Sequence, residues 1–157
     1  MLNHVLVPLD ESELSESALS YVPRLIGSGG QVTLLTVIVP PDLSLSSLYA
    51  VPSQPDPALL ESEEGLARQL RIQAEAYLRK KAEHLQNTGL KVESLVQVGQ
   101  PADSIVENAA DLGVEAIIMA THGRSGVSRW LLGSVTQKVL SAAPCPVFVI
   151  PSRHHAD

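Results

Sequence analysis

The stretch that decides the fold is Ile117-Ile-Met-Ala-Thr-His-Gly-Arg-Ser-Gly126, which is followed by Leu131-Leu-Gly-Ser-Val-Thr136. An apolar run typical of a strand stops at a loop of small residues, and Gly133-Ser134 then opens a helical pattern. Strand, glycine-bearing loop and helix N-terminus together form a recurring phosphate site, because free N–H groups point outward and glycine allows close approach. An ordinary βα loop with turn glycines has the same pattern, so the stretch alone leaves both interpretations open.

The same alternation of strand and helix extends outward from this stretch along the whole chain. Five apolar runs indicate strands, namely Val5–Leu9, Val32–Val39, Val92–Val98, Val114–Ala120 and Pro146–Ile150. Helical patterns separate them, the first beginning after capping residues at Asp10–Ser12 and the others covering Leu59–Asn87, Ala102–Asp111 and Ser134–Ala142. The order predicts an α/β fold with a parallel sheet, whose right-handed crossovers bury both faces.

The first helical pattern contains its own interruption. Pro23 lies inside it and predicts a kink or an early end, because proline lacks the N–H that the helix needs. Gly27–Gly30 is expected to close this helix before the second strand begins.

Length and composition limit the possible classes of protein. A chain of 157 residues suits one domain, and 45% hydrophobic with only 3% aromatic residues predicts an aliphatic core. The formal net charge of -6 and a pI near 5.3 argue against a general nucleic-acid surface. Any phosphate ligand would therefore have to be held by local donors and not by the overall field.

Cysteine, histidine and hydropathy patterns exclude further classes. The single cysteine, Cys145, cannot form an intrachain disulfide and reads as a buried small apolar residue. The five histidines show no metal-ligand spacing, so we expect no protein-bound metal cluster. No apolar run reaches membrane length and the N-terminus shows no signal-peptide pattern, which makes a cytoplasmic protein without membrane contact the expectation.

Motifs for covalent or phosphoryl-transfer chemistry are missing from the sequence. No Gly-x-x-x-x-Gly-Lys-Ser/Thr occurs, and Gly27–Gly30 precedes a strand, which is the reverse of a dinucleotide fingerprint. Gly123-Arg-Ser-Gly126 nearly matches a nucleophile elbow, but Val127 occupies the last glycine position. We therefore assign no catalytic residue and expect binding without efficient turnover.

Two loops remain as candidate binding elements. Pro8-Leu9-Asp10 ends the first strand, and Ala120–Thr136 follows the fourth. A carboxylate at a strand end can accept hydrogen bonds from a ribose diol or can cap the next helix, and both interpretations of Asp10 stay open.

These loops carry a resemblance to a known family. The segments that carry it are Val5-Leu-Val-Pro-Leu-Asp10, Gly99-Gln-Pro-Ala102, Ala120-Thr-His-Gly-Arg124, Leu131-Leu-Gly-Ser-Val135 and Cys145-Pro-Val-Phe-Val149. Over essentially its whole length the chain resembles the universal stress protein family. Members that bind ATP carry Gly-x-x-Gly, nine residues and then Gly-Ser/Thr; here Gly123 and Gly133-Ser134 keep that spacing, while Ala120 replaces the first glycine.

The resemblance implies an architecture and a function. It implies an open five-stranded parallel sheet in the order 3-2-1-4-5, with two helices on each face, similar to the adenine-nucleotide alpha-hydrolase-like folds. The domain would cover residues 1–152, with a frayed tail at 153–157. The implied function is an ATP-binding regulatory module of the stress response; the alternative is a dimeric scaffold of the same fold that binds a protein partner and no nucleotide.

The resemblance also implies site residues. The ligand would be ATP, ADP or AMP, with Mg²⁺ among the outer phosphate oxygens, and no metal ligand is assigned to the protein. Residues implied for the base, ribose and phosphates are Pro8, Leu9, Asp10, Val37, Met119, Ala120, Gly123, Gly133, Ser134, Val135 and Thr136. Alanine fits at position 120 if only a small residue is needed, but it would distort the loop if a positive φ is required.

A homodimer through Pro146–Ile150 is expected, because this strand would lie at the sheet edge with unpaired N–H and C=O groups. The resemblance implies the same, since related proteins pair these strands across a two-fold axis. The alternative is a monomer, because Pro146 and Pro151 lack donors and blunt the edge.

Overall fold

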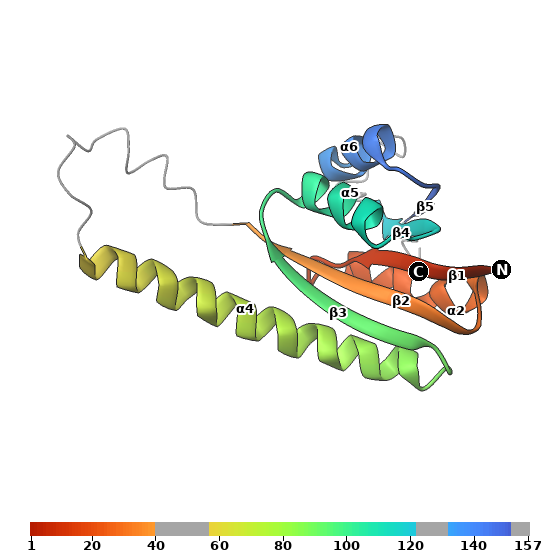
Figure 1. The fold of residues 1–157 in the computed structure, drawn as a ribbon, viewed down its shortest axis with the longest axis horizontal. Coiled ribbons are helices and arrows are strands. Elements are labelled where there is room, and N and C mark those ends of the chain that lie inside the picture. Colours follow the sequence, from red (N-terminus) through yellow and green to blue (C-terminus); the bar gives the residue numbers. More distant parts are fainter. Residues whose placement is uncertain (40–56, 122–131, 152–157) are drawn as a thin grey trace, which may run out of the picture.

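The computed structural model describes residues 1–39, 57–121 and 132–151, with the side chains of one long helix described from residue 64 onward. The strands are β1 (Leu2–Pro8), β2 (Ile26–Ile38), β3 (Lys91–Val98), β4 (Ala116–Ala120) and β5 (Val147–Ile150). The helices are α1 (Glu13–Glu16), the 3₁₀ turn η1 (Ser17–Ser20), α2 (Val22–Leu25), α4 (Pro57–Gln86), α5 (Pro101–Asp111) and α6 (Ser134–Ala142) (Figure 1).

The five strands form one parallel sheet in the order β3-β2-β1-β4-β5, which confirms the predicted topology. β1 lies at its centre and pairs with β2 on one side and with β4 on the other. All five residues of β4 are buried, because helices cover both faces of the sheet.

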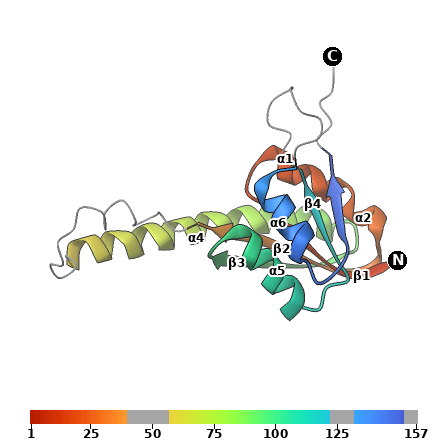
Figure 2. The ribbon, with the colours of Figure 1, turned by 90° about the horizontal axis from the view of Figure 1, so that it is seen from above.

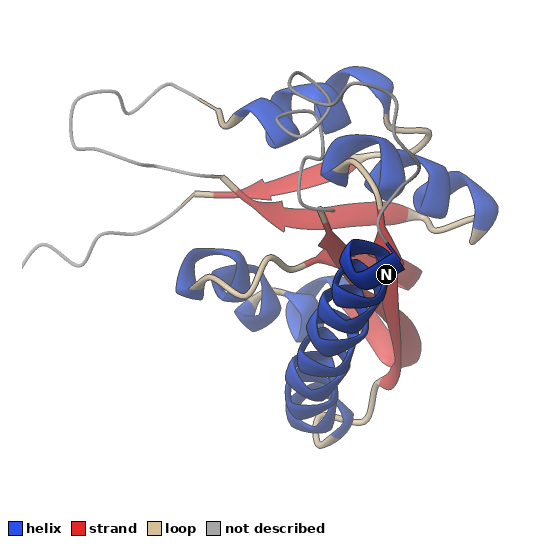
Figure 3. Ribbon diagram, turned by 90° about the vertical axis from the view of Figure 1, so that its left-hand side faces the viewer, coloured by secondary structure: helices blue, strands red, loops and turns tan. Residues whose placement is uncertain are grey.

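Two layers of helices enclose the sheet, two helical segments to a face as predicted (Figure 3). One layer consists of the broken crossover α1–η1–α2 together with α4, which pack over Val5 and Val7 of β1. The other consists of α5 and α6, which pack over Leu6 on the opposite face of the same strand. Side chains that alternate along β1 thus contribute to two separate cores.

The long helix α4 contacts the sheet through only part of its length. Ala74, Leu78, Ala82 and Leu85 lie in the core, whereas residues 64–69 and 71–73 are exposed. Figure 2 shows the N-terminal half extending past the sheet. Among the helices that the structure describes, none is both long and apolar enough to cross a membrane.

The predicted role of Gly27–Gly30 is wrong. These residues do not close a helix, because the short α2 ends at Leu25 and the chain already enters β2 at Ile26. Pro23 lies in the first turn of α2. Leu2 pairs with Ile26 but His4 pairs with Gln31, so the glycine segment absorbs a register shift in the β1–β2 ladder. The glycines therefore form an irregular start to β2.

We expect two glycine substitutions to change stability in opposite directions. A Cβ at Gly30 would lie 2.3 Å from Ile26 Cγ2 and 3.0 Å from the Gly27 carbonyl oxygen, so Gly30→Ala should destabilise the fold by about 1–3 kcal/mol. Gly65 is exposed inside α4 with open space around it, so Gly65→Ala should stabilise by up to about 1 kcal/mol. Urea unfolding measures both, and equal effects of the two variants would contradict the packing described for Gly30.

Candidate functional site

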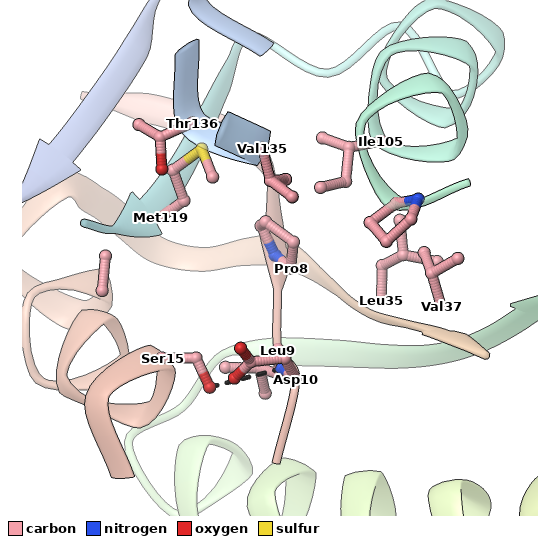
Figure 4. Close-up of a pocket in the computed structure, with 12 residues that line it drawn as sticks. Pro8, Leu9, Asp10, Ser15, Leu35, Val37, Ile105, Met119, Val135 and Thr136 are labelled. Atoms are coloured by element: carbon pink, nitrogen blue, oxygen red, sulfur yellow. Dashed lines mark hydrogen bonds between the residues drawn. The ribbon is translucent and has the colours of Figure 1, made fainter. Parts of the chain in front are cut away.

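A cavity of about 140 Å³ opens at the carboxyl ends of the central strands (Figure 4). Its floor is the end of the sheet, and α5 and α6 supply one wall. The lining is mostly apolar and comes from six helices and strands and from the turn that follows β1. The lining residues are Pro8, Leu9, Asp10, Ser15, Leu35, Val37, Pro101, Ile105, Met119, Ala120, Val135 and Thr136.

The topology explains why the cavity forms at this place. β1 and β4 are neighbours, with Val5 beside Ala116 and Leu6 beside Ile117. After β1 the chain enters the layer formed by α1–η1–α2 and α4. The next helix after β4 is α6, which lies in the opposite layer together with α5. Because the winding reverses between these two strands, their connections diverge and leave a crevice at the carboxyl edge.

Asp10 lines the cavity and also helps to start the first helix. Its Oδ1 accepts hydrogen bonds from the backbone N–H of Ser12 at 3.1 Å and from the Ser12 hydroxyl at 2.5 Å. Ser12 is in turn the N-cap of α1, since its Oγ accepts from the Ser15 N–H at 3.1 Å. The N-cap is thus Ser12 and not Asp10, whose carboxylate supports the capping serine from a position beside the cavity.

The short helix α1 is tied to α4 by a polar cluster next to the cavity. Glu16 accepts a hydrogen bond from the Tyr77 hydroxyl at 3.1 Å and forms an ion pair with Lys81 at 2.6 Å. Burial, and then the hydrogen bond to Glu16, raise the pKa of Tyr77 well above its usual value, so the phenol remains a donor. This cluster holds the Asp10 side of the cavity against the long helix.

Ala120 is the last residue of β4, where it pairs with Ile150 and is 8% exposed. Among the non-glycine residues that the structure describes, only Glu11 has a positive φ. Position 120 therefore adopts ordinary extended backbone that alanine tolerates. Compared with glycine, Ala120 changes the cavity only by the space that its methyl group occupies.

The N-terminus of α6 lies at the same edge of the sheet. Gly133 is the N-cap, Ser134 is the first helical residue, and among the described residues no side chain caps the turn. Backbone N–H groups in the first turn of a helix have no intrahelical acceptor and favour anions. Val135 and Thr136 line the cavity, and the Thr136 side chain is 1% exposed.

Eight of the eleven residues predicted for the site line this one cavity: Pro8, Leu9, Asp10, Val37, Met119, Ala120, Val135 and Thr136. Gly133 and Ser134 do not line it but start the helix whose next residues do. Gly123 lies outside the described residues. The prediction missed Ser15, Leu35, Pro101 and Ile105, although the Gly99-Gln-Pro-Ala102 motif already pointed to the start of α5.

Groups suited to metal or thiol chemistry do not gather at the cavity. Among the side chains that the structure describes, in residues 1–39, 64–121 and 132–151, no three His, Cys, Asp or Glu are placed to hold a metal ion. Cys145 is partly rather than fully buried, packs against the core under α5 and α6, and has its pKa raised by burial.

A parallel α/β sheet with a crevice at its switch point defines a class of ligand-binding folds. A model of the universal stress protein family matches residues 1–151, and the chain belongs to this family.

Individual relatives agree with this assignment. Universal stress protein MJ0577 of Methanocaldococcus jannaschii is 30% identical over 158 residues, covering 98% of each chain. Its solved structure superimposes with a TM-score of 0.79 at 32% identity, over 98% of this chain and 99% of that one.

Two more distant structures share the fold at 19% identity. One is a universal stress protein in complex with cAMP, with a TM-score of 0.65 over 97% of this chain and 98% of that chain. The other is a family protein from Arabidopsis thaliana with AMP bound, with a TM-score of 0.63 over 98% and 94%.

Glu11 gives a test of the turn beside the cavity. Its φ of 65° costs a side-chain-bearing residue about 1–2 kcal/mol, so Glu11→Gly should leave stability unchanged or raise it by up to about 1 kcal/mol after the entropic cost of glycine. Glu13→Gly, at an exposed helical position two residues later, should destabilise instead. Thermal unfolding compares the two, and a clear loss of stability in Glu11→Gly would contradict the turn geometry.

Proposed function

We propose that this protein binds an adenine nucleotide in the cavity and serves as a regulatory stress-response module without efficient turnover. The observation that carries the proposal is the convergence of eight residues, assigned to the nucleotide by family resemblance, on one cavity beside the start of α6. The solved complexes of family members with cAMP and AMP support the same class of ligand.

The base would occupy the apolar part of the cavity. Pro8, Val37 and Met119 offer hydrophobic surface from three adjacent strands or strand ends, and Ile105 covers them from α5. A flat, largely apolar ring gains affinity from such a lining, while the few polar groups at the rim fix its orientation. Backbone groups near Val37, at the end of β2, would meet the polar edge of the base.

The ribose and the phosphates would occupy the two polar sides of the cavity. Asp10 would accept a hydrogen bond from a ribose hydroxyl, and the phosphates would lie at the N-terminus of α6, together with Gly123 of the preceding loop. The chain carries a net charge of -6, so these local N–H and hydroxyl donors, and not the overall field, would bind the anion.

The ligand would be ATP, ADP or AMP. With the longer nucleotides Mg²⁺ would be held by phosphate oxygens, an arrangement that suits a site whose described residues offer backbone and hydroxyl groups more than carboxylates. The chemistry that Mg²⁺ supplies is charge neutralisation at the phosphates. No residue of the cavity is assigned as nucleophile or general base.

The direct experiment identifies the nucleotide. Purified protein is quenched with acid, released small molecules are identified by mass, and calorimetry then measures the affinities of ATP, ADP, AMP and cAMP. We expect micromolar binding of at least one of them. Absence of any nucleotide in the extract together with no binding heat would overturn the proposal and leave the partner-binding scaffold as the interpretation.

Gly133→Val tests the phosphate position. Added bulk at the N-cap keeps the backbone of α6 away from the phosphates, so nucleotide affinity should fall at least about tenfold. Ala142→Val adds bulk at the other, exposed end of the same helix and is the control, with unchanged affinity expected. Unchanged calorimetric affinity in Gly133→Val would place the phosphates elsewhere.

Ala120→Gly tests the departure from the ATP-binding pattern. Because residue 120 has extended backbone, removing its methyl group only enlarges the cavity, and nucleotide affinity should stay the same or rise. A large loss of affinity would mean that the methyl group itself contacts the base or the ribose.

We also propose a homodimer through Pro146–Ile150. Among the five described strands β5 is an edge, paired only with β4, and Phe148 on it is 37% exposed. An edge strand leaves N–H and C=O groups that a second copy can satisfy. Pro146 and Pro151 flank the strand and limit, but do not remove, its pairing capacity.

Light scattering at tens of micromolar protein tests the dimer. The expected mass is twice 16.7 kDa, and Phe148→Asp should reduce it to the monomer value because a charge would be buried at the interface. Val98→Asp is the control, because Val98 is also an exposed apolar residue but lies on β3, the opposite edge strand. This variant should leave the mass unchanged. A wild-type mass near 16.7 kDa would decide against the dimer.

A further inference from the structure

The peptide unit between Leu9 and Asp10 is held by a residue that does not line the cavity. Thr36 lies near the end of β2, is 5% exposed, and donates a hydrogen bond from its hydroxyl to the Leu9 carbonyl oxygen at 3.0 Å. The Leu9 N–H donates to the Leu35 carbonyl oxygen at 2.8 Å, so the chain is still attached to β2 where β1 has ended.

The other end of the same peptide unit is held from α1. The Asp10 N–H donates to the Ser15 Oγ at 3.3 Å (Figure 4), and the Ser15 hydroxyl donates to the Ser12 carbonyl oxygen at 2.9 Å. Because a peptide unit is planar, fixing its carbonyl oxygen and its N–H fixes the position of the Asp10 Cα, from which the side chain leaves the backbone. The Ser12 N–H and hydroxyl then hold the carboxylate at the end of that side chain.

The turn needs such support from outside. Glu11, the next residue, has a φ of 65°, a conformation that costs free energy and persists only where the surroundings enforce it. The buried hydroxyl of Thr36 provides the attachment on the side of the sheet. Without it the Leu9 carbonyl group would be left in a buried setting with one partner fewer, and the turn would rotate to reach another donor.

We propose that Thr36 is a positioning residue for ribose recognition, acting through the Leu9–Asp10 peptide unit on the Asp10 carboxylate. The inference rests on the proposed nucleotide site and adds to it the origin of its sugar selectivity. Thr36 itself contacts neither base nor sugar. Its removal should therefore affect the discrimination between sugars while the apolar cavity and the start of α6 still bind base and phosphate.

The test compares AMP with 2′,3′-dideoxy-AMP, which lacks both ribose hydroxyls. The wild-type protein should bind AMP at least about tenfold more tightly, the size expected for a hydrogen bond to a charged group. Thr36→Val keeps the shape of the side chain and removes the hydroxyl, and its affinity ratio should fall toward one. Thr36→Ser keeps the hydroxyl and should retain most of the wild-type ratio.

Thr33→Val is the matched control. Thr33 lies in the same strand, is 3% exposed, and its hydroxyl hydrogen-bonds the His4 ring at 3.0 Å, away from the cavity. Both valine variants should lose similar stability, yet only Thr36→Val should change the affinity ratio. A general loss of stability would weaken the binding of both nucleotides alike. The ratio of the two affinities therefore separates an effect on positioning from an effect on folding.

The outcomes are distinct. No binding of either nucleotide by wild type overturns the proposed function and this inference with it. Equal binding of both by wild type, or an unchanged ratio in folded Thr36→Val, overturns the inference and leaves nucleotide binding standing. Thr36→Ala is measured in parallel, because it also lacks the hydroxyl. If Thr36→Val fails to fold, the affinity ratio of Thr36→Ala decides whether the inference holds. In an Asp10→Asn background, Thr36→Val should change the ratio no further.

Discussion

The pairing of β1 with both β2 and β4 is the constraint on which the rest of the structure depends. A central parallel strand has its backbone groups satisfied from two sides, and its side chains must be buried on two faces. That requirement sets the aliphatic, nearly aromatic-free composition, because Val5, Leu6 and Val7 enter two different cores in succession. It also sets the site, since the connections that follow β1 and β4 separate into opposite layers and leave their carboxyl ends uncovered.

Much of this architecture could be predicted from local pattern. The five strands and four helical segments follow from apolar periodicity, and burial of both faces follows from the β-α alternation. The strand order came from family resemblance, since periodicity alone does not choose between windings. The Gly27–Gly30 error has a physical cause: glycines normally mark a turn, but α2 had already ended at Leu25, and an irregularity in the β1–β2 ladder accommodated the extra residues.

The candidate site was predictable where it follows strand ends and not where it depends on packing. Pro8–Asp10 and Met119–Ala120 end adjacent strands, so topology places them together. Ser15 and Ile105 enter the cavity only because α1 and α5 dock at particular angles, which no local pattern specifies. The positive φ of Glu11 has no sequence signal either, because glutamate does not favour that conformation and tertiary contacts impose it.

The division between apolar floor and polar rim bears on what such a site can distinguish. Hydrophobic contact with the base depends on buried area and shape, and it differs little between nucleotides that share the base. Under the proposed function, discrimination between sugars and between phosphate chains would therefore come from the rim, where Asp10 and the start of α6 lie on separate elements. Since the chain is acidic overall, phosphates would gain nothing from a general attractive field, and only the local N–H and hydroxyl donors at the start of α6 would bind them. The orientation of the Asp10 turn rests on the buried hydroxyls of Thr36 and Ser15, so under the proposed function the selectivity of the site would depend in part on a residue that does not line the cavity.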